Sequence, residues 1–291
     1  MRFSLLVSFL LVAQFSWGQN GFVSDPDQAK FITSDIPRFW EAFDHMNNAD
    51  NPFEEYLEGG SAGLKDFIPY RIESPENLRK VAREKKADYQ SVRATTLKVP
   101  EITDQIRGYY QNFKMLYSDA VFPPTFFVIG AYNSGGTASK NGLIIGMEMK
   151  SDISRVPVVV AHELIHFNQT YPREKNTLLL QSVTEGSADF LAELMSGEQM
   201  NETAFAYGEA NEATLCREFV KIMGRGKYKG WLYGSSGKKK GRPNDLGYWI
   251  GYKITKAYYD KQADKRQAIR DILNIKDVKA FVRESGYLEG Y

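Results

Sequence analysis

The chain has 291 residues, 43% of them hydrophobic and 25% charged, with a formal net charge of +1. This is the composition of an ordinary soluble globular protein, and the near-neutral charge gives no reason to expect a nucleic-acid partner. The single cysteine, Cys216, excludes an internal disulfide and argues against a small disulfide-stapled domain, while the length suits one large domain or two small ones.

Residues 1–18 have the pattern of a signal peptide. Arg2 supplies a positive start, and the apolar run 5–12 is too short to cross a bilayer. Ser16 and Gly18 place small residues at positions −3 and −1 of a predicted cut before Gln19. The alternative is a hydrophobic first helix of the fold. We expect an exported bacterial protein, periplasmic or secreted, with neither a lipid anchor nor a membrane span after the signal is removed.

Residues 27–119 form a predicted helical N-terminal part. Apolar residues at helical spacing predict helices at 36–47 and 102–116, and 76–89 reads as a charged helix. His45 lies in the first of these. It could be a distant metal ligand, although a lone histidine is more often an ordinary surface or core residue.

Two β-prone runs follow, at 125–130 and 143–147, with a glycine-rich turn at 133–137 between them. The turn could hold an anion, but no lysine or nucleotide-binding pattern accompanies it, so a plain hairpin loop is expected. These strands predict a small sheet packed against the helix that comes next. An edge strand of such a sheet can bind an extended peptide backbone by strand addition.

The most informative segment is His162-Glu163-Leu164-Ile165-His166, which uses two of the three histidines in the chain. On a helix, positions i and i+4 share one face, so both imidazoles can reach one zinc ion. Glu163 is then placed to act as a general base. Ser151 to Ser154 offer N-cap residues, Pro157 falls in the first turn, and Tyr171-Pro172 ends the helix. The alternative is a buried helix with two hydrogen-bonded core histidines.

Zinc needs a third protein ligand and leaves a fourth position open. Pro172 stands where the metzincin pattern requires a histidine, so a carboxylate is needed. The best source is Glu185, in a helix predicted at 176–195 that returns after one turn.

Glu185, Asp189 and Glu193 share one face of that predicted helix. Stacked carboxylates repel one another unless a cation neutralises them, which a zinc site would do. Asp189 is a candidate to accept the second ring N–H of a ligand histidine. Gly186 and Ala188 leave room for the two metal helices to approach closely. A solvated acidic face is the alternative interpretation.

The rest of the chain reads as a helix at 201–223, a basic loop at 224–241 and two or three C-terminal helices. The loop could attract anions, but a solvated surface loop is the default. Tyr248 and Tyr252, four apart on a predicted helix, are candidate donors to the oxyanion of the reaction, with Arg242 next. A tyrosine pair packed on the core is equally compatible.

AHELIH followed by TEGSAD resembles the gluzincin metallopeptidases, the thermolysin-like and aminopeptidase-like group. The resemblance implies Glu185 as the third ligand and Asp189 behind a ligand histidine. A closer resemblance covers most of the mature chain. It is to a family of predicted zinc-dependent proteases of bacterial envelope proteins, related to gliding-motility lipoproteins. It rests on 126–136, AHELIHFNQ, VTEGSADFLAEL and 247–252. The Gly-Ala-Met-Glu-Asn motif of aminopeptidases is absent.

Together these patterns predict an α+β, mostly helical zincin-like fold as one domain over 19–291, with its metal-site core at 123–197 and a helical part at 201–291. The predicted function is that of an exported peptidase with one Zn²⁺ per chain and a peptide or protein substrate. The alternatives are a silent peptidase-like envelope scaffold and a zinc hydrolase of non-peptide substrates.

Overall fold

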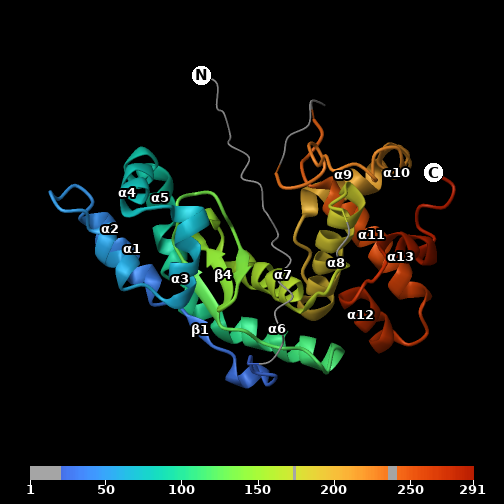
Figure 1. Cartoon of the computed structure of the whole chain (residues 1–291), viewed down its shortest axis with the longest axis horizontal. Helices are drawn as coiled ribbons and strands as arrows, with labels where there is room; N and C mark the ends of the chain where they lie inside the picture. Colours follow the sequence, from blue (N-terminus) through green and yellow to red (C-terminus); the bar gives the residue numbers. More distant parts are fainter. Residues whose placement is uncertain (1–20, 173–174, 235–240) are drawn as a thin grey trace. The chain divides into compact units, whose positions relative to one another are not determined.

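The computed structural model describes residues 21–172, 175–234 and 241–291. The predicted signal peptide and Lys238 to Lys240 of the basic loop lie outside the described residues. The described chain forms two compact units, the first ending at Phe167 and the second running from Asn168 to Tyr291. Their elements are labelled along the chain in Figure 1.

The first unit holds seven of the described α-helices: α1 (Asp35–Asp44), α2 (Phe53–Glu58), α3 (Ala62–Phe67), α4 (Pro75–Glu84), α5 (Lys86–Thr96), α6 (Thr103–Leu116) and α7 (Val156–Asn168). The helices predicted at 36–47 and 102–116 are confirmed as α1 and α6. The helix predicted at 76–89 is instead two helices, because Lys85 leaves the helical backbone region with φ −109° and ψ 28°.

A four-stranded sheet belongs to the same unit, in the order β1 (Phe31–Ile32), β2 (Thr125–Val128), β4 (Gly142–Gly146), β3 (Thr137–Ser139). The two predicted strands are confirmed as β2 and β4, and the α+β, mostly helical fold class is confirmed. The plain hairpin expected between these strands is wrong, because β2 and β4 run parallel. The glycine-rich turn leads instead into β3, which pairs antiparallel with β4.

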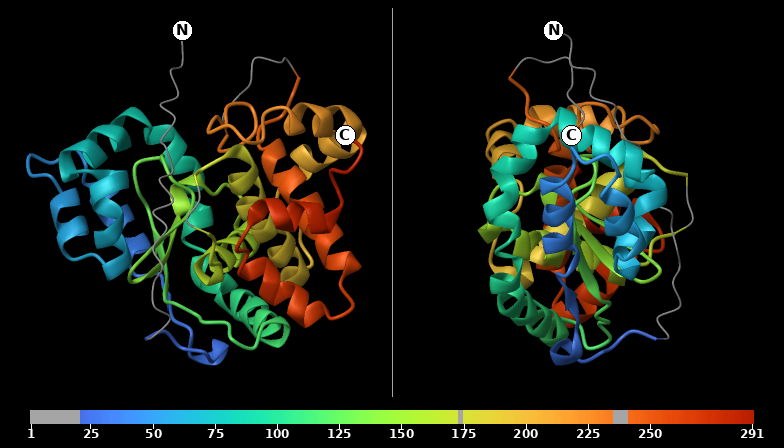
Figure 2. Two further views of the ribbon diagram at one scale, coloured as in Figure 1. Left: turned by 45° about the vertical axis from the view of Figure 1, so that its right-hand side comes forward. Right: turned by 90° about the vertical axis from the view of Figure 1, so that its left-hand side faces the viewer.

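Every residue of β2 and β4 is buried, as expected for parallel strands covered on both faces. Helices α1 and α3 pack on β2, and α3 also packs on β4, as Figure 2 shows. The approach of α3 depends on Gly63. A Cβ added there would lie 2.2 Å from Cγ of Phe126, so only glycine permits this contact.

Three buried tyrosines hold the ends of β2. The Tyr110 hydroxyl bonds to Oγ1 of Thr125 at 2.9 Å, at the start of the strand. Beyond its end, Tyr56 donates to the carbonyl of Ile129 at 2.9 Å and Tyr89 to that of Gly130 at 2.6 Å. Helices α2, α5 and α6 therefore fix the path of the chain into the glycine-rich turn.

The second unit contains α8 (Leu178–Ser196), α9 (Glu202–Ala210), α10 (Glu212–Val220), α11 (Leu246–Lys261), α12 (Lys265–Leu273) and α13 (Val278–Ser285). The helix predicted at 176–195 is confirmed as α8, which ends at Gly197 in the left-handed conformation. The helix predicted at 201–223 divides into α9 and α10, because Asn211 leaves the helical region with φ −128°.

Helix α8 is the buried element of this unit and packs closely along α11. A Cβ added at Gly251 would lie 1.7 Å from the carbonyl oxygen of Ser182, and one added at Gly186 would lie 2.1 Å from the amide nitrogen of Tyr252. The sequence suggests that Gly186 serves the approach of the histidine helix. The atoms nearest to Gly186 belong to α11 instead. Gly186 therefore lies where the backbone of α8 approaches the backbone of α11.

The start of α8 is held by its own cap and by a loop. The Thr177 hydroxyl accepts from the amide of Leu180 at 3.2 Å. The amides of Leu178 and Leu179 donate to the carbonyls of residues 225 and 223, each at 2.8 Å. These bonds satisfy donors that a helix start leaves without partners, and they set the position of Glu185 two turns further on.

Candidate metal centre

Helix α7 presents the two histidines of the motif on one face. Nε2 of His162 and Nε2 of His166 lie 2.9 Å apart, and the ring planes are nearly perpendicular at 86°. His162 is 5% exposed. The two ring nitrogens are thus aimed at nearly the same point, which is the geometry that i, i+4 spacing predicts.

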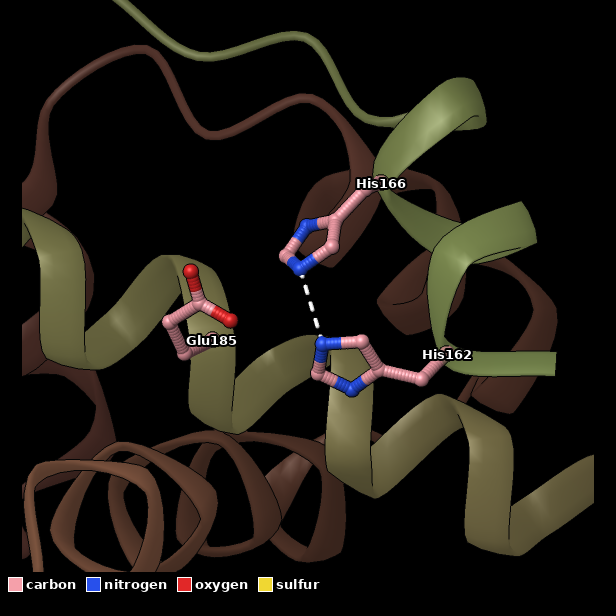
Figure 3. A group of neighbouring side chains, drawn as sticks. All are labelled: His162, His166 and Glu185. Carbon is pink, nitrogen blue, oxygen red and sulfur yellow. Dashed lines mark hydrogen bonds between the residues drawn. The ribbon is translucent and has the colours of Figure 1, made fainter. Parts of the chain in front are cut away.

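Glu185 of α8 completes the group. Its carboxylate and the two imidazoles each offer one ligand atom, and these atoms all lie within 4.8 Å of one another. Figure 3 shows the three side chains directed toward one another. His45 is not part of this group: it is exposed and stands at the C-terminal cap of α1.

The three side chains fit a zinc ion. With bonds of about 2.0–2.1 Å in a tetrahedron, zinc ligand atoms stand roughly 3.3 Å from one another. The 2.9 Å between the histidine nitrogens and the 4.8 Å limit for the group bracket that value. Two imidazoles and one carboxylate also leave one coordination position open, as catalytic zinc sites do.

Residues just after α7 attach to α8 beside Glu185. The side-chain amide of Gln169 donates to Oγ of Ser187 at 3.0 Å and to the carbonyl of Thr184 at 3.3 Å. The Tyr171 hydroxyl bonds to the same Oγ at 2.6 Å. These contacts hold the segment before α8 against the helix that bears Glu185. The predicted end of the helix at 171–172 is late, because α7 stops at Asn168.

Further carboxylates surround Glu185. Asp189 is 5% exposed and accepts a hydrogen bond from Nδ2 of Asn201 at 2.7 Å. Burial raises the pKa of Asp245, and the negative charges of Glu185 and Asp189 raise it further. A cation at the group would relieve this repulsion. The role of Asp189 as acceptor for a ring N–H stays a prediction.

Glu163, half-buried on α7, lies against the glycine-rich turn. A Cβ added at Gly136 would lie 2.4 Å from Oε1 of Glu163, and one added at Gly135 would lie 2.9 Å from Nζ of Lys150. Burial lowers the pKa of Lys150, while the charges of Glu163 and Glu148 raise it. Because the two glycines have no side chains, the Glu163 carboxylate and the Lys150 ammonium group can lie close to the turn. Sequence reasoning did not connect these two residues, and it did not identify Lys150 as a site residue.

The two candidate tyrosines have different surroundings. Burial raises the pKa of Tyr248, and the next largest cause is the charge of Glu185. For Tyr252, burial is followed by the charge of Glu193 and a hydrogen bond with it. The Tyr252 ring also packs on Phe205, with centroids 4.8 Å apart. Tyr248 is therefore the tyrosine of this pair associated with the candidate ligand.

Arg242, the next candidate after the tyrosines, is engaged elsewhere. It pairs with Glu218 at 2.7 Å, and its guanidinium lies 4.4 Å from the ring centroid of Trp231. These contacts anchor the end of the basic loop. Neither of these two contacts involves the three candidate ligand residues.

The three residues could hold a single metal ion, and the Glu163 carboxylate stands one position from His162 in the chain. The chain matches the family described as "Predicted Zn-dependent protease (DUF2268)" over residues 128–279, and it belongs to that family. The match includes both histidines, Glu163, Glu185 and Asp189. No curated protein and no solved structure matches the chain at a significant level.

A buried carboxyl near this site makes stability depend on pH. Glu148 is 1% exposed, and burial raises its pKa from the ordinary 4.5 to about 7, against hydrogen bonds from the backbone of residues 130 and 132 and the charge of Lys150. The folded state therefore keeps this proton between pH 4.5 and 7, where the unfolded state has lost it. The stabilising contribution of Glu148 to the free energy of unfolding is fully present below pH 4.5 and is lost as pH rises through 7.

We expect Glu148→Gln to become more stable relative to the wild type as pH rises. The unfolding free energy of the variant minus that of the wild type should increase by about 3 kcal/mol between pH 4.5 and 8, because each pKa unit corresponds to about 1.4 kcal/mol. Glutamine keeps the shape of the side chain but does not titrate. Urea unfolding of both proteins across this range measures the difference. Two stability curves that stay parallel would show that Glu148 ionises normally in the folded state.

Proposed function

We propose that this protein is an exported zinc-dependent peptidase in which His162, His166 and Glu185 hold one zinc ion and Glu163 is the general base. The observation that carries the proposal is the convergence of those three ligand atoms within 4.8 Å, with Glu163 next to one of them in the chain. Membership in a family of predicted zinc-dependent proteases supports peptide bonds as the target.

The residues divide the work of hydrolysis. Zinc, when bound, would acidify a water molecule toward a pKa of about 7 and polarise a substrate carbonyl. Glu163 accepts the proton of the attacking water and later gives it to the leaving amine, so that each peptide bond consumes one water. Gly136, in contact with the Glu163 carboxylate, limits where that group can point. Tyr248 donates a hydrogen bond to the negative charge that develops on the carbonyl oxygen.

Export is part of the proposal and rests on residues 1–18, whose pattern is that of a signal peptide. None of the helices in the described part of the chain has the length and apolar content that crossing a membrane requires. We propose a peptide or protein of the bacterial envelope or its surroundings as the substrate.

The test is a peptide-library digest of the mature protein, read by mass spectrometry. One sample is reconstituted with zinc, and a second is stripped of metal by a chelator. We expect cleavage in the zinc-loaded sample alone, with new termini at defined bonds. A zinc-binding protein that leaves every peptide intact would instead favour a silent scaffold of the same shape or a hydrolase of non-peptide substrates.

The two tyrosines of α11 can be separated by removing only a hydroxyl. Tyr248→Phe should lower kcat by about 10²–10³-fold with little change in KM, because the lost hydrogen bond acts mainly in the transition state. Tyr252→Phe should be nearly silent, since Glu193 rather than Glu185 is the carboxylate whose charge most raises the pKa of Tyr252. Steady-state kinetics with zinc content and melting temperature as controls decide this. Full activity in both variants would place the donor elsewhere.

A further inference from the structure

The glycine-rich turn after β2 is anchored by contacts on either side of it. Tyr132, which leads into the turn, has a φ of +59°, in the left-handed region that a bulky residue occupies only where its surroundings hold it there. The amide of Tyr132 donates to Oε1 of the buried Glu148 at 3.3 Å, and Nδ2 of Asn133 donates to the carbonyl of Arg71 at 2.7 Å. These contacts set the path of the turn.

Two charged groups lie against neighbouring glycines of this turn. A Cβ added at Gly135 would lie 2.9 Å from Nζ of Lys150, and one added at Gly136 would lie 2.4 Å from Oε1 of Glu163. Consecutive Cα atoms stand about 3.8 Å apart, close to the length that one residue of an extended peptide spans. All four residues are half-exposed, so a ligand can reach them. A peptide bound beside Glu163 therefore brings a neighbouring residue within reach of Lys150.

The Lys150 ammonium group has no bonded counter-ion in the part of the chain that the structure describes. Within those residues its Nζ makes no hydrogen bond, and no carboxylate oxygen lies at ion-pair distance from it. Glu163 and Glu148 act on it through their charges, but burial raises the pKa of Glu148 to about 7, which reduces its charge at neutral pH. Because a half-buried ammonium group is costly without a bonded anion, this position favours an anion supplied by a ligand.

A carboxylate is the anion that peptides carry, on acidic side chains and at the free C-terminus. Beside the negative charge of Glu163 such a group would be repelled unless a cation stood within reach. Lys150 supplies that cation, and Gly135 leaves the space next to its Nζ free of a side chain.

We propose that Lys150 forms a carboxylate-binding subsite next to Glu163, so that the protein selects peptide bonds adjacent to a residue that bears a carboxylate. That group is an acidic side chain or the free C-terminus, since both present the same two oxygens to the ammonium group. The inference deepens the proposed function and rests on it, because it takes Glu163 as the base beside the cleaved bond.

Peptides of one cleavable sequence test the subsite. They carry glutamate or glutamine beside the cleaved bond, and they end in a free or an amidated C-terminus. Wild-type kcat/KM should be about 10–100-fold higher with the preferred carboxylate than with its amide, as for hydrogen bonds to charged groups. Lys150→Met keeps the length of the side chain and removes the charge, so the preference should disappear. A preference for glutamate identifies an acidic side chain as the ligand, and a preference for the free C-terminus identifies the terminal carboxylate.

Lys140→Met is the matched control. Lys140 is exposed between β3 and β4, and its side chain is not among the atoms nearest to Gly135 or Gly136. The variant removes the same positive charge from the same region of the chain. It should keep the wild-type preference.

Peptide binding to proteins stripped of metal gives a second readout that needs no turnover. It also removes the zinc ion, which could itself bind a substrate carboxylate. Isothermal titration calorimetry should give a Kd about 10–100-fold higher for the amide than for the preferred carboxylate in the wild type and in Lys140→Met. The two Kd values should be equal in Lys150→Met.

The outcomes separate this inference from the proposed function. A wild type that cleaves no peptide but binds carboxylate peptides through Lys150 overturns the proposed function alone. A wild type without the preference in kcat/KM and in Kd overturns the inference. So does a Lys150→Met protein whose rates fall by one factor on every peptide, because Lys150 would then act on Glu163 rather than on substrate. If circular dichroism shows that Lys150→Met is unfolded, Lys150→Gln replaces it, and an unchanged preference there would overturn the inference.

Discussion

Glu163→Gln should abolish turnover while leaving the metal in place. Glutamine has the size of glutamate but cannot accept a proton at neutral pH, so kcat should fall by at least about 10²–10⁴-fold. Zinc content should stay at one per chain, because His162, His166 and Glu185 are untouched. The measurement is peptide hydrolysis by the zinc-loaded variant, with zinc determined in the same samples.

Glu193→Gln is the matched control for this experiment. Glu193 is a carboxylate of α8 whose charge and hydrogen bond act on Tyr252, outside the three ligand atoms. The control should keep both zinc and activity. A native rate in Glu163→Gln would remove Glu163 from the mechanism. Loss of zinc in that variant would give it a structural role instead.

Glu185→Ala should cost the protein its zinc. Removing one of three protein ligands leaves two imidazoles, whereas a catalytic zinc site needs three protein ligands to hold the ion. We expect no stoichiometric zinc after dialysis of this variant, and no hydrolysis. Asp189→Ala should weaken zinc binding by about 10–100-fold without abolishing it, as for groups that orient a ligand.

Elemental analysis of the dialysed proteins measures both changes, with circular dichroism to show that the helices remain. Stoichiometric zinc in Glu185→Ala would exclude Glu185 as a ligand. Equal and complete loss in the two variants would make Asp189 a ligand as well, or would show that α8 had collapsed.

The part of the site encoded locally could be read from the sequence. His162, Glu163 and His166 lie within two helical turns, so their common face follows from helix geometry alone. Glu185 required a second argument, the need for a third ligand when only His45 was left. The structure places Glu185 in the same group as the two histidines and His45 outside it.

The contacts around these residues could not be read in this way, because they depend on tertiary packing. Gly135 and Gly136 look like a hairpin turn in sequence, and only the fold brings Lys150 and Glu163 against them. Tyr233 carries no local signal at all. Its left-handed backbone, with φ +61°, and the hydrogen bond of its hydroxyl to Gln181, 52 residues away, depend on tertiary packing.

The strands show the same limit. β2 and β4 are buried apolar runs, and their composition reveals them. β1 has two residues and β3 has three, with half-exposed or exposed side chains, so neither has a pattern long enough to detect. The parallel pairing of β2 with β4 is likewise a property of the path between them, which local sequence does not encode.

Anomalous diffraction at the zinc absorption edge, from crystals of the zinc-loaded protein, tests the metal site most directly. We predict one anomalous peak per chain, about 2.0–2.2 Å from Nε2 of His162, Nε2 of His166 and a carboxylate oxygen of Glu185. A peak bound by other residues, or loaded crystals with no peak at this group, would contradict the account.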